Sequence, residues 1–417
     1  MATRSVRLSE KTHSSSVSRA GQADFSTADA ALTPLWVVVG LAMGPAVALG
    51  LSRFAYALLL PLMRAELGWS FADAGAMNTA NAAGYLAGAL ITAPLGRWIG
   101  NKRVFAIGLL LTALCVGATG MTSHFTLLLV LRTLTGVTGA LAFVAGAGLT
   151  SAAAAGGSKS RAPTVLGVYF AGAGLGVMAS ALTIPPLLSA TGWRGGWLAL
   201  GGLSLLATIY GWLVLSRTPE PAHHATRARG GWSVKFMVCK LLSYCLYGAG
   251  YITYATFIVA YLRSNVGFNS YGITTFWSVL GLAAIVAAFA WGPVLGHLKG
   301  GWGTAATVAM VAVGAVLPLI WPTAAGAYLS AVLFGGSFLA VVAAVTSFAR
   351  RAAQPHAWTA AIAALTVAFG VGQCIGPILS GALSDGPSGI RAGLWLSVGI
   401  LTLSVIAAAF QPEPEAS

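Results

Sequence analysis

The chain has 417 residues, of which 57% are hydrophobic and only 8% are charged, and its formal net charge is +14. A soluble globular protein carries about 25% charged residues, so this composition excludes that class and indicates an integral membrane protein with many spans. The apolar residues come in long continuous runs without the alternation of barrel strands, which predicts spanning α-helices.

The sequence predicts twelve membrane-spanning helices, because each apolar run is long enough to cross a hydrocarbon layer of about 30 Å. We place them near residues 35–63, 73–98, 104–121, 126–150, 163–188, 194–215, 236–262, 272–296, 303–322, 325–349, 358–383 and 391–410.

Polar segments divide these spans into two sets of six. Residues 1–33 are rich in Ser and Arg without the apolar core of a secretory signal, and we expect a disordered cytoplasmic tail. Residues 216–235 form a basic linker between a first bundle, 34–215, and a second bundle, 236–410, and residues 411–417 form a short cytoplasmic tail.

The basic residues outside the spans are distributed unevenly between the two sides. Most fall on the side of the N-terminal tail, and the other side has only Arg64, Arg194, Arg263 and Arg391. Positive loops stay in the cytoplasm, so we expect both termini inside the cell and the protein in a bacterial inner membrane. Topology therefore explains the net charge, and we expect no nucleic-acid partner.

The two halves share a weak internal repeat at an offset close to 200. Internal repeats are typical of transporters that bind their substrate between two bundles. The matches are Leu95-Gly96 with Leu295-Gly296, Gly100 with Gly300, Gly136 with Gly336, and Gly172 and Gly176 with Gly372 and Gly376.

Four segments carry a resemblance to a known family. The run TGWRGGW enters the sixth span and RTLTGVTG lies in the fourth, while LSRFAYALLLPLM and YGAGYITYATF lie in the first and seventh. Together with the two sets of six spans, they resemble the major facilitator superfamily, in particular its mostly uncharacterised YbfB/YjiJ-type branch. The resemblance implies an all-α fold of two pseudo-symmetric six-helix bundles and secondary transport by alternating access.

The loop after the second span departs from that superfamily's pattern, G-x-L-x-D-R-x-G-R-K. Here it is APLGRWIGNK, which keeps Leu95, Gly100 and Lys102 but places Arg97 where the aspartate is expected. His297 holds the related place in the second half. We predict that Arg97, Lys102 and His297 belong to gating loops.

Three cations lie inside apolar stretches, whereas all nine carboxylates lie outside these stretches or at their edges. A charge at the centre of a spanning helix costs about 2.5–3.5 kcal/mol, so such residues usually face a bundle interior or a water-filled pathway. Arg53 lies about 16 Å below the outer surface. It is the best candidate for an anion contact, with Tyr56 one turn away on the same face; the alternative is a structural arginine bound to carbonyl groups.

Arg132 opens the RTLTGVTG run of the fourth span. The resemblance places it at the arginine of a superfamily motif associated with proton coupling in antiporters. That motif normally works beside membrane acids, and this chain has none in its spans except at their edges. Functional and structural interpretations of Arg132 both remain open.

The third cation, Lys240, begins a stripe of tyrosines on one face of the seventh span: Tyr244, Tyr247, Tyr251 and Tyr254. We predict that Lys240, Tyr244 and Tyr247 line a pathway and that Tyr251 and Tyr254 contact substrate. The alternative is an interfacial aromatic belt.

Polar side chains on two other spans complete the candidate site. Asn78, Asn81 and Tyr85 form a similar face on the second span, and Gln373 adds an amide in the eleventh. We predict that both asparagines and Gln373 bind substrate; the alternative is hydrogen bonding between helices.

These observations predict a secondary transporter that moves a small organic anion, coupled to protons or to exchange for another anion. One alternative is a multidrug or metabolite efflux permease, and an alternative of another class is a receptor or sensor with a transporter fold. No phosphate-binding loop, metal cluster or catalytic triad appears, so we expect no enzymatic activity, cofactor or metal. The expected partners are the anion, the lipid bilayer and a coupling proton or counter-anion, and we expect a monomer.

Overall fold

The computed structural model describes residues 33–155, 161–221, 233–354 and 357–414, and within them every regular element is a helix. The all-α fold predicted from the sequence is confirmed. Of the predicted N-terminal tail, central linker and C-terminal tail, residues 1–32, 222–232 and 415–417 lie outside the described residues.

The first half contains six spans. The first span runs through α1 (Leu35–Leu41), α2 (Met43–Pro45), the π-helix η1 (Ala46–Phe54) and α3 (Tyr56–Leu67), and the others lie in α4 (Phe71–Ile99), α5 (Asn101–Thr119), α6 (Phe125–Ala155) and α7 (Ala162–Leu215). The 54 residues of α7 hold two spans, because Gly192 has a φ of 62° and non-helical geometry there interrupts the helix. Glycine adopts a positive φ without the steric cost that a Cβ imposes.

The second half contains the other six spans. They are α8 (Val234–Asn265), α9 (Ser270–His297), α10 (Trp302–Ile320), the pair α11 (Ala324–Gly335) and α12 (Phe338–Ala352), α13 (Trp358–Ser384) and α14 (Gly389–Ala409). Ten described segments are long and apolar enough to cross a membrane, with α7 counted once. The second span of α7, together with the more polar α4, brings the total to the predicted twelve.

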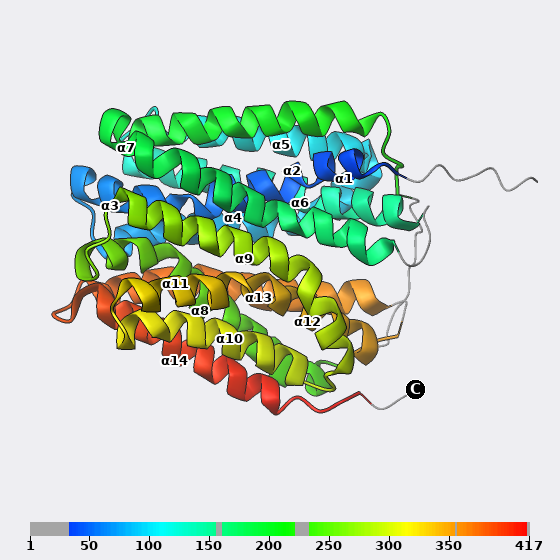
Figure 1. Cartoon of the computed structure of the whole chain (residues 1–417). Coiled ribbons are helices and arrows are strands. Elements are labelled where there is room, and N and C mark those ends of the chain that lie inside the picture. The colour runs from blue at the N-terminus through cyan, green and yellow to red at the C-terminus, as the bar shows by residue number, and fades with distance from the viewer. Residues whose placement is uncertain (1–32, 156–160, 222–232, 355–356, 415–417) are drawn as a thin grey trace, which may run out of the picture.

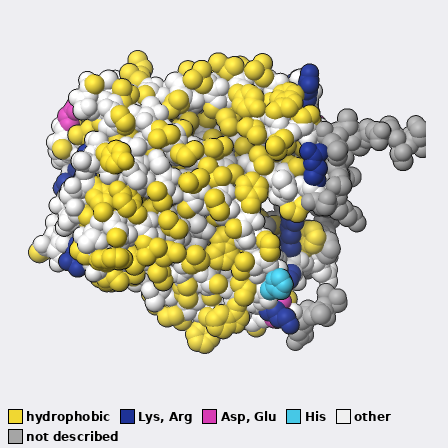
Figure 2. Space-filling view, viewed as in Figure 1, with side chains coloured by type: hydrophobic (Ala, Val, Ile, Leu, Met, Phe, Trp, Pro, Cys, Tyr) yellow, Lys and Arg dark blue, Asp and Glu magenta, His cyan; other side chains and the backbone are white. Residues whose placement is uncertain are grey.

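The two halves lie one above the other, and the described chain begins and ends on the same side (Figure 1). We call this the terminal side, and the side of residues 68–70 and 385–388 the far side. A broad apolar surface covers the molecule between them, and Lys and Arg gather along the terminal edge (Figure 2). This distribution suits a protein surrounded by lipid.

The internal repeat is visible in how the halves pack. Each glycine of two matching pairs lies against backbone of the first helix of its own half, close enough that a Cβ would touch a carbonyl group. The contacts are Gly172 with Ala42, Gly176 with Ala46, Gly372 with Cys245, and Gly376 with Ala249. The predicted match of Gly136 with Gly336 is wrong by one residue. Gly136 packs on Asn81 and Gly335 packs on Leu280, whereas Gly336 lies against its own helix.

The halves approach each other closely where α7 meets α9. A Cβ on Gly174 would lie 2.5 Å from the carbonyl oxygen of Gly281, and a Cβ on Gly281 would lie 2.8 Å from that of Gly174. Small residues allow helix backbones to approach closely in membranes, where packing is the main attraction between helices. This pair therefore helps to set the spacing of the halves.

We expect Gly174→Ala to lower the unfolding temperature in detergent, because the added methyl overlaps the Gly281 carbonyl and overpacking costs about 1–3 kcal/mol. Gly202→Ala is the matched control, since nothing lies within 4 Å of a Cβ at that position. Equal unfolding temperatures for the two variants would contradict the requirement for a small residue at Gly174.

Candidate functional site

Arg53 lies on the π-helical part of the first span. The nine residues Ala46–Phe54 form wider turns than an α-helix, a feature often found at functional sites. The Arg53 side chain is 2% exposed, and its Nη2 donates a 2.7 Å hydrogen bond to Oε1 of Gln373 on α13. The guanidinium also stands over the ring of Tyr85, 5.4 Å from the centroid. Arg53 thus connects the first half to the second.

Most of the Arg53 hydrogen-bonding capacity is unused within the described residues. Its Nε is buried without a partner. Its Nη1 also makes no hydrogen bond there and is not among the buried unpaired atoms, so it reaches accessible space. Since a guanidinium has five N–H donors in a planar fork, this side chain can still accept an anion.

Gln373 continues the connection into the tyrosine stripe. Its Nε2 donates a hydrogen bond to the hydroxyl of Tyr251 on α8. Arg53, Gln373 and Tyr251 therefore form one chain of polar contacts from three spans. The structure brings together these three residues, which the sequence predicted as substrate contacts.

Arg132 is the second buried arginine, and its contacts differ from those of Arg53. Its Nη1 donates a 2.6 Å hydrogen bond to the Ser52 carbonyl inside η1, and its Nη2 donates to Oδ1 of Asn78 at 3.3 Å. It also stands over the Tyr56 and Trp197 rings, at 5.1 and 5.3 Å from their centroids. These contacts hold the first, second and fourth spans together, in keeping with the structural interpretation.

Tyr56 does not share the surroundings of Arg53, although helical spacing placed the two on one face. Its hydroxyl donates to the Ala74 carbonyl at 2.9 Å, and its ring stacks on Trp197, 6.3 Å between centroids. The wider turns of η1 end at Phe54, between the two residues, so the spacing of an ideal α-helix does not apply. Tyr56 lies with Arg132 instead.

The two predicted asparagines make contacts between helices. Asn78 donates from Nδ2 to Thr256 on α8 at 2.5 Å and accepts from Arg132, so it connects the halves. Asn81 donates to the Arg132 carbonyl at 3.2 Å. Both are 2% exposed. These hydrogen bonds correspond to the alternative interpretation for the second span.

The tyrosine stripe divides into two parts. Tyr244, Tyr247 and Tyr251 stack with Phe369 of α13, and the planes of these four rings lie within 16° of each other wherever two are in contact. Tyr254 turns away to Phe334, 4.4 Å between centroids, and hydrogen-bonds Ser330.

Lys240 also turns away from the stacked rings. Its ammonium donates a 2.9 Å hydrogen bond to Thr304 on α10 and lies 4.3 Å from the centroid of Phe348 on α12. The side chain is fully buried. Lys240 therefore lies among helices of the second half, and its predicted place in a pathway stays a prediction.

Polar contacts between the halves are confined to the middle and the far side of the described structure. Besides Arg53–Gln373 and Asn78–Thr256, they comprise Thr79 with the Cys374 carbonyl and Asp385 with the N-terminus of α4. The Asp385 carboxylate accepts from the backbone N–H groups of Phe71 and Ala72 at 2.7 and 3.0 Å. A carboxylate is stabilised by the free N–H groups and dipole of a helix N-terminus. Asp385 therefore fastens the far side.

Two glutamates that the sequence analysis did not single out hold the loops on the terminal side. Glu220 accepts hydrogen bonds from the backbone N–H groups of Asn101 and Lys102, at the start of α5. The residues predicted for gating are close by: Lys102 is one of these donors, Arg97 is exposed on α4, and His297 contacts the Pro293 carbonyl of its own helix at 2.8 Å. An acid does serve the loop after α4, but it comes from the segment after α7.

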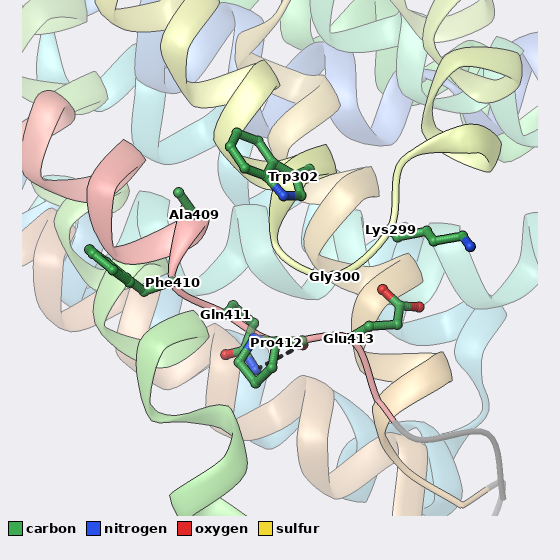
Figure 3. A pocket seen from close by; sticks show the side chains of 8 residues that line it. All are labelled: Lys299, Gly300, Trp302, Ala409, Phe410, Gln411, Pro412 and Glu413. Atoms are coloured by element: carbon green, nitrogen blue, oxygen red, sulfur yellow. Dashed lines mark hydrogen bonds between the residues drawn. The ribbon is translucent and has the colours of Figure 1, made fainter.

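Glu413 holds the equivalent position in the second half. It lines a pocket beside the turn at Gly300, and its carboxylate points toward that turn (Figure 3). A Cβ on Gly300 would lie 3.5 Å from Glu413 Oε2, and a Cβ on Gly100 would lie 3.6 Å from Glu220 Oε1. The matching segments Thr218-Pro219-Glu220-Pro221 and Gln411-Pro412-Glu413-Pro414 were the sequence signal for this pair.

No group of three His, Cys, Asp or Glu side chains within the described residues could hold a metal ion. The four cysteines are free. The groups that the candidate site offers to a ligand are the buried Arg53 guanidinium, side-chain amides and aromatic rings.

Comparison with known proteins decides the family. The profile described as "Uncharacterised MFS-type transporter YbfB" matches residues 45–409. The chain belongs to this MFS-type transporter family. The inner membrane transport protein YnfM of Escherichia coli (strain K12) is 29% identical over 199 residues, which is 46% of this chain and 45% of that protein. The chain is thus aligned with less than half the length of this curated relative.

Solved structures show the same fold as this MFS-type chain. The nucleoside transporter NupG superposes with a TM-score of 0.70 at 14% identity, covering 90% of this chain and 99% of that one. A bacterial homolog of the human lysosomal transporter Spinster, inward-facing and unoccupied, gives 0.65 at 15% identity, covering 90% and 96%. Its occupied form gives 0.67 at 16% identity with the same coverage. The family and the fold confirm a multi-pass membrane transporter.

We expect Arg132→Ala to lower the unfolding temperature of this transporter, because each hydrogen bond to a charged group contributes about 1.5–3 kcal/mol and two are lost. Arg97→Ala is the control, since Arg97 is exposed. An unchanged unfolding temperature for Arg132→Ala would contradict the structural role.

We expect Asp385→Asn to open the far side more often, because interaction of a charge with a helix N-terminus contributes about 0.3–2 kcal/mol. Spin labels at Met121 and Tyr271, each 78% exposed on the far side of opposite halves, report the separation of the halves. The variant should populate longer distances. Glu66→Gln, which breaks the Arg194–Glu66 ion pair within the first half, should not. Identical distributions for Asp385→Asn and the unmodified protein would refute the fastening role.

Proposed function

We propose that this MFS-type transporter is a secondary active transporter that moves a small organic anion by alternating access, coupled to protons or to exchange for another anion. The observation that carries the proposal is the unbalanced charge of Arg53. Among the described residues, the ion pairs are Arg194–Glu66 and Arg351–Glu413, both at loops and helix ends. Within the described residues, Arg53 and Arg132 are buried without a carboxylate partner, and the groups that they hydrogen-bond are neutral.

The two buried arginines are near neighbours, because Arg132 donates to the carbonyl of Ser52, the residue before Arg53. A buried charge needs a compensating partner, and an anion beside Arg53 provides one. The planar guanidinium can hold both oxygens of a carboxylate at once, which a lysine cannot. Nη1 of Arg53 makes no hydrogen bond within the described residues, and Nη2 has a second N–H besides the one that it donates to Gln373, so these two nitrogens are available for such a pairing.

The position of Arg53 connects binding with movement of the halves. Its hydrogen bond to Gln373 crosses between them, so an anion at Arg53 acts where the two bundles meet. The polar contacts at Asp385 must open when the far side opens, and loops held by Glu220 and Glu413 lie on the terminal side. This arrangement supports rocking of the two repeats about a central site.

We further propose that the terminal side is cytoplasmic and that the membrane is the inner membrane of a bacterium. Lys and Arg gather at the terminal edge (Figure 2), which is the distribution that the positive-inside rule associates with the cytoplasm. Since no described carboxylate lies beside the buried arginines, a coupling proton would travel with the anion, or a second anion would return through the same site.

Transport in proteoliposomes tests the function. Labelled small carboxylates should be taken up or exchanged, and organic cations of similar size should not. Transport of cations without anions would contradict the proposal and favour an efflux permease for cationic compounds.

We expect Arg53→Ala to abolish anion binding and Arg53→Lys to retain less than about a tenth of transport, because Lys keeps the charge but loses the two-oxygen pairing. Binding is followed by the rise in unfolding temperature that a ligand of the folded form produces. Normal anion affinity in folded Arg53→Ala protein would remove Arg53 from the site.

A further inference from the structure

A column of nearly parallel aromatic rings from α8 and α13 lies beside the contacts that join Tyr251, Gln373 and Arg53. Tyr244 and Phe369 are 4.6 Å apart between centroids, Tyr247 and Tyr251 are 4.9 Å apart, and Tyr251 and Phe369 are 5.6 Å apart. Interplanar angles in these three pairs are 15°, 16° and 11°. The column ends at Tyr244 on the terminal side, and Phe369 is only half-buried.

Polar atoms that have no protein partner lie along this column. The hydroxyls of Tyr85 and Tyr244 make no hydrogen bond within the described residues and are not among their buried unpaired atoms, so both reach accessible space. Tyr85 lies under the Arg53 guanidinium, whose Cζ is 5.4 Å from the centroid of its ring. Open donors and ring surface therefore occur together beside the arginine.

The distance between these groups along α8 limits the length of the ligand that they can bind. Tyr244 and Tyr251 are separated by seven residues, or about 10 Å along α8 at 1.5 Å per residue. Tyr251 marks the Arg53 end, through Gln373, and the Tyr244 hydroxyl marks the other. A ligand with one ring and an acid group at one end fits this distance when the acid group hydrogen-bonds Arg53 and the opposite end of the ligand hydrogen-bonds Tyr244.

We propose that the ligand of this site is a planar aromatic carboxylate. This inference rests on the proposed transport of an organic anion and narrows its substrate class. The carboxylate pairs with Arg53, and the ring extends the column at Tyr244 and Phe369. The open hydroxyl of Tyr244, at the end away from Arg53, binds a ring substituent such as a phenol. An aliphatic acid fills the same volume but cannot stack parallel to the rings.

A matched pair of probes tests the inference. Benzoate and cyclohexanecarboxylate have the same charge and number of carbons, and only benzoate is flat and aromatic. In competition with radiolabelled benzoate on purified full-length protein, we expect benzoate to bind at least about fivefold tighter than cyclohexanecarboxylate. 4-Hydroxybenzoate should bind tighter than benzoate, and Tyr244→Phe should reduce that gain.

Two variants separate the ring contact from general effects. Phe369→Leu should bring the benzoate advantage below twofold and leave cyclohexanecarboxylate binding unchanged. Phe410→Leu, at a position 75% exposed at the end of α14, should alter neither. If Phe369→Leu does not fold, the selectivity of the unmodified protein and of Tyr244→Phe still decides the matter.

The outcomes distinguish this inference from the function on which it rests. Equal binding of the two probes, or tight binding of anions without a ring while benzoate fails, would overturn the aromatic assignment alone. Failure of every anion to bind, with Arg53→Gln indistinguishable from the unmodified protein, would overturn the proposed function as well.

Discussion

One constraint governs the centre of this protein: a buried guanidinium near the middle of the first span, whose one hydrogen-bond partner among the described residues is an uncharged amide. Arg53 donates to Gln373 across the two halves, and no carboxylate within the described residues pairs with it. Burial of a charge without a counter-charge is unfavourable, so the site favours any anion that can reach the free nitrogens. The rest of the structure places that arginine between the two halves and leaves its Nη1 without a hydrogen bond among the described residues.

Two breaks in regular α-helix lie near the site, η1 in the first span and the join between α11 and α12. Backbone carbonyl groups at these breaks accept hydrogen bonds from side chains. Arg132 donates to Ser52 within η1, while Trp291 and Tyr247 donate to Gly336 and Phe338, where α11 gives way to α12. Non-helical backbone at membrane depth is tolerated only when its polar groups find partners in this way. The two irregular spans meet at Phe54 and Phe338, whose rings pack edge to face at 5.3 Å. The carboxylates Asp385, Glu220 and Glu413 act at the rims, where helix ends and loops offer N–H groups or basic side chains.

The lengths of the apolar runs were sufficient to predict twelve spans. Its position deep in the first span selected Arg53, helical spacing from Lys240 selected Tyr251, and an amide within an apolar run selected Gln373. Ideal helical spacing failed at Tyr56, because η1 ends between it and Arg53. Ideal helical spacing also could not predict that Lys240 hydrogen-bonds α10 and Tyr254 hydrogen-bonds α11, because those partners are distant in sequence. The roles of Glu220 and Asp385 depend on chain segments that meet only in the fold. The repeated Pro-Glu-Pro segments were the one available signal for the first of these.

A structure of the protein with its tightest-binding anion tests the central claim most directly. The account predicts that the charged group of that ligand lies within hydrogen-bond distance of the Arg53 guanidinium, between the two halves. Ligand density whose charged group contacts another cation, with Arg53 still bound only to Gln373, would contradict it.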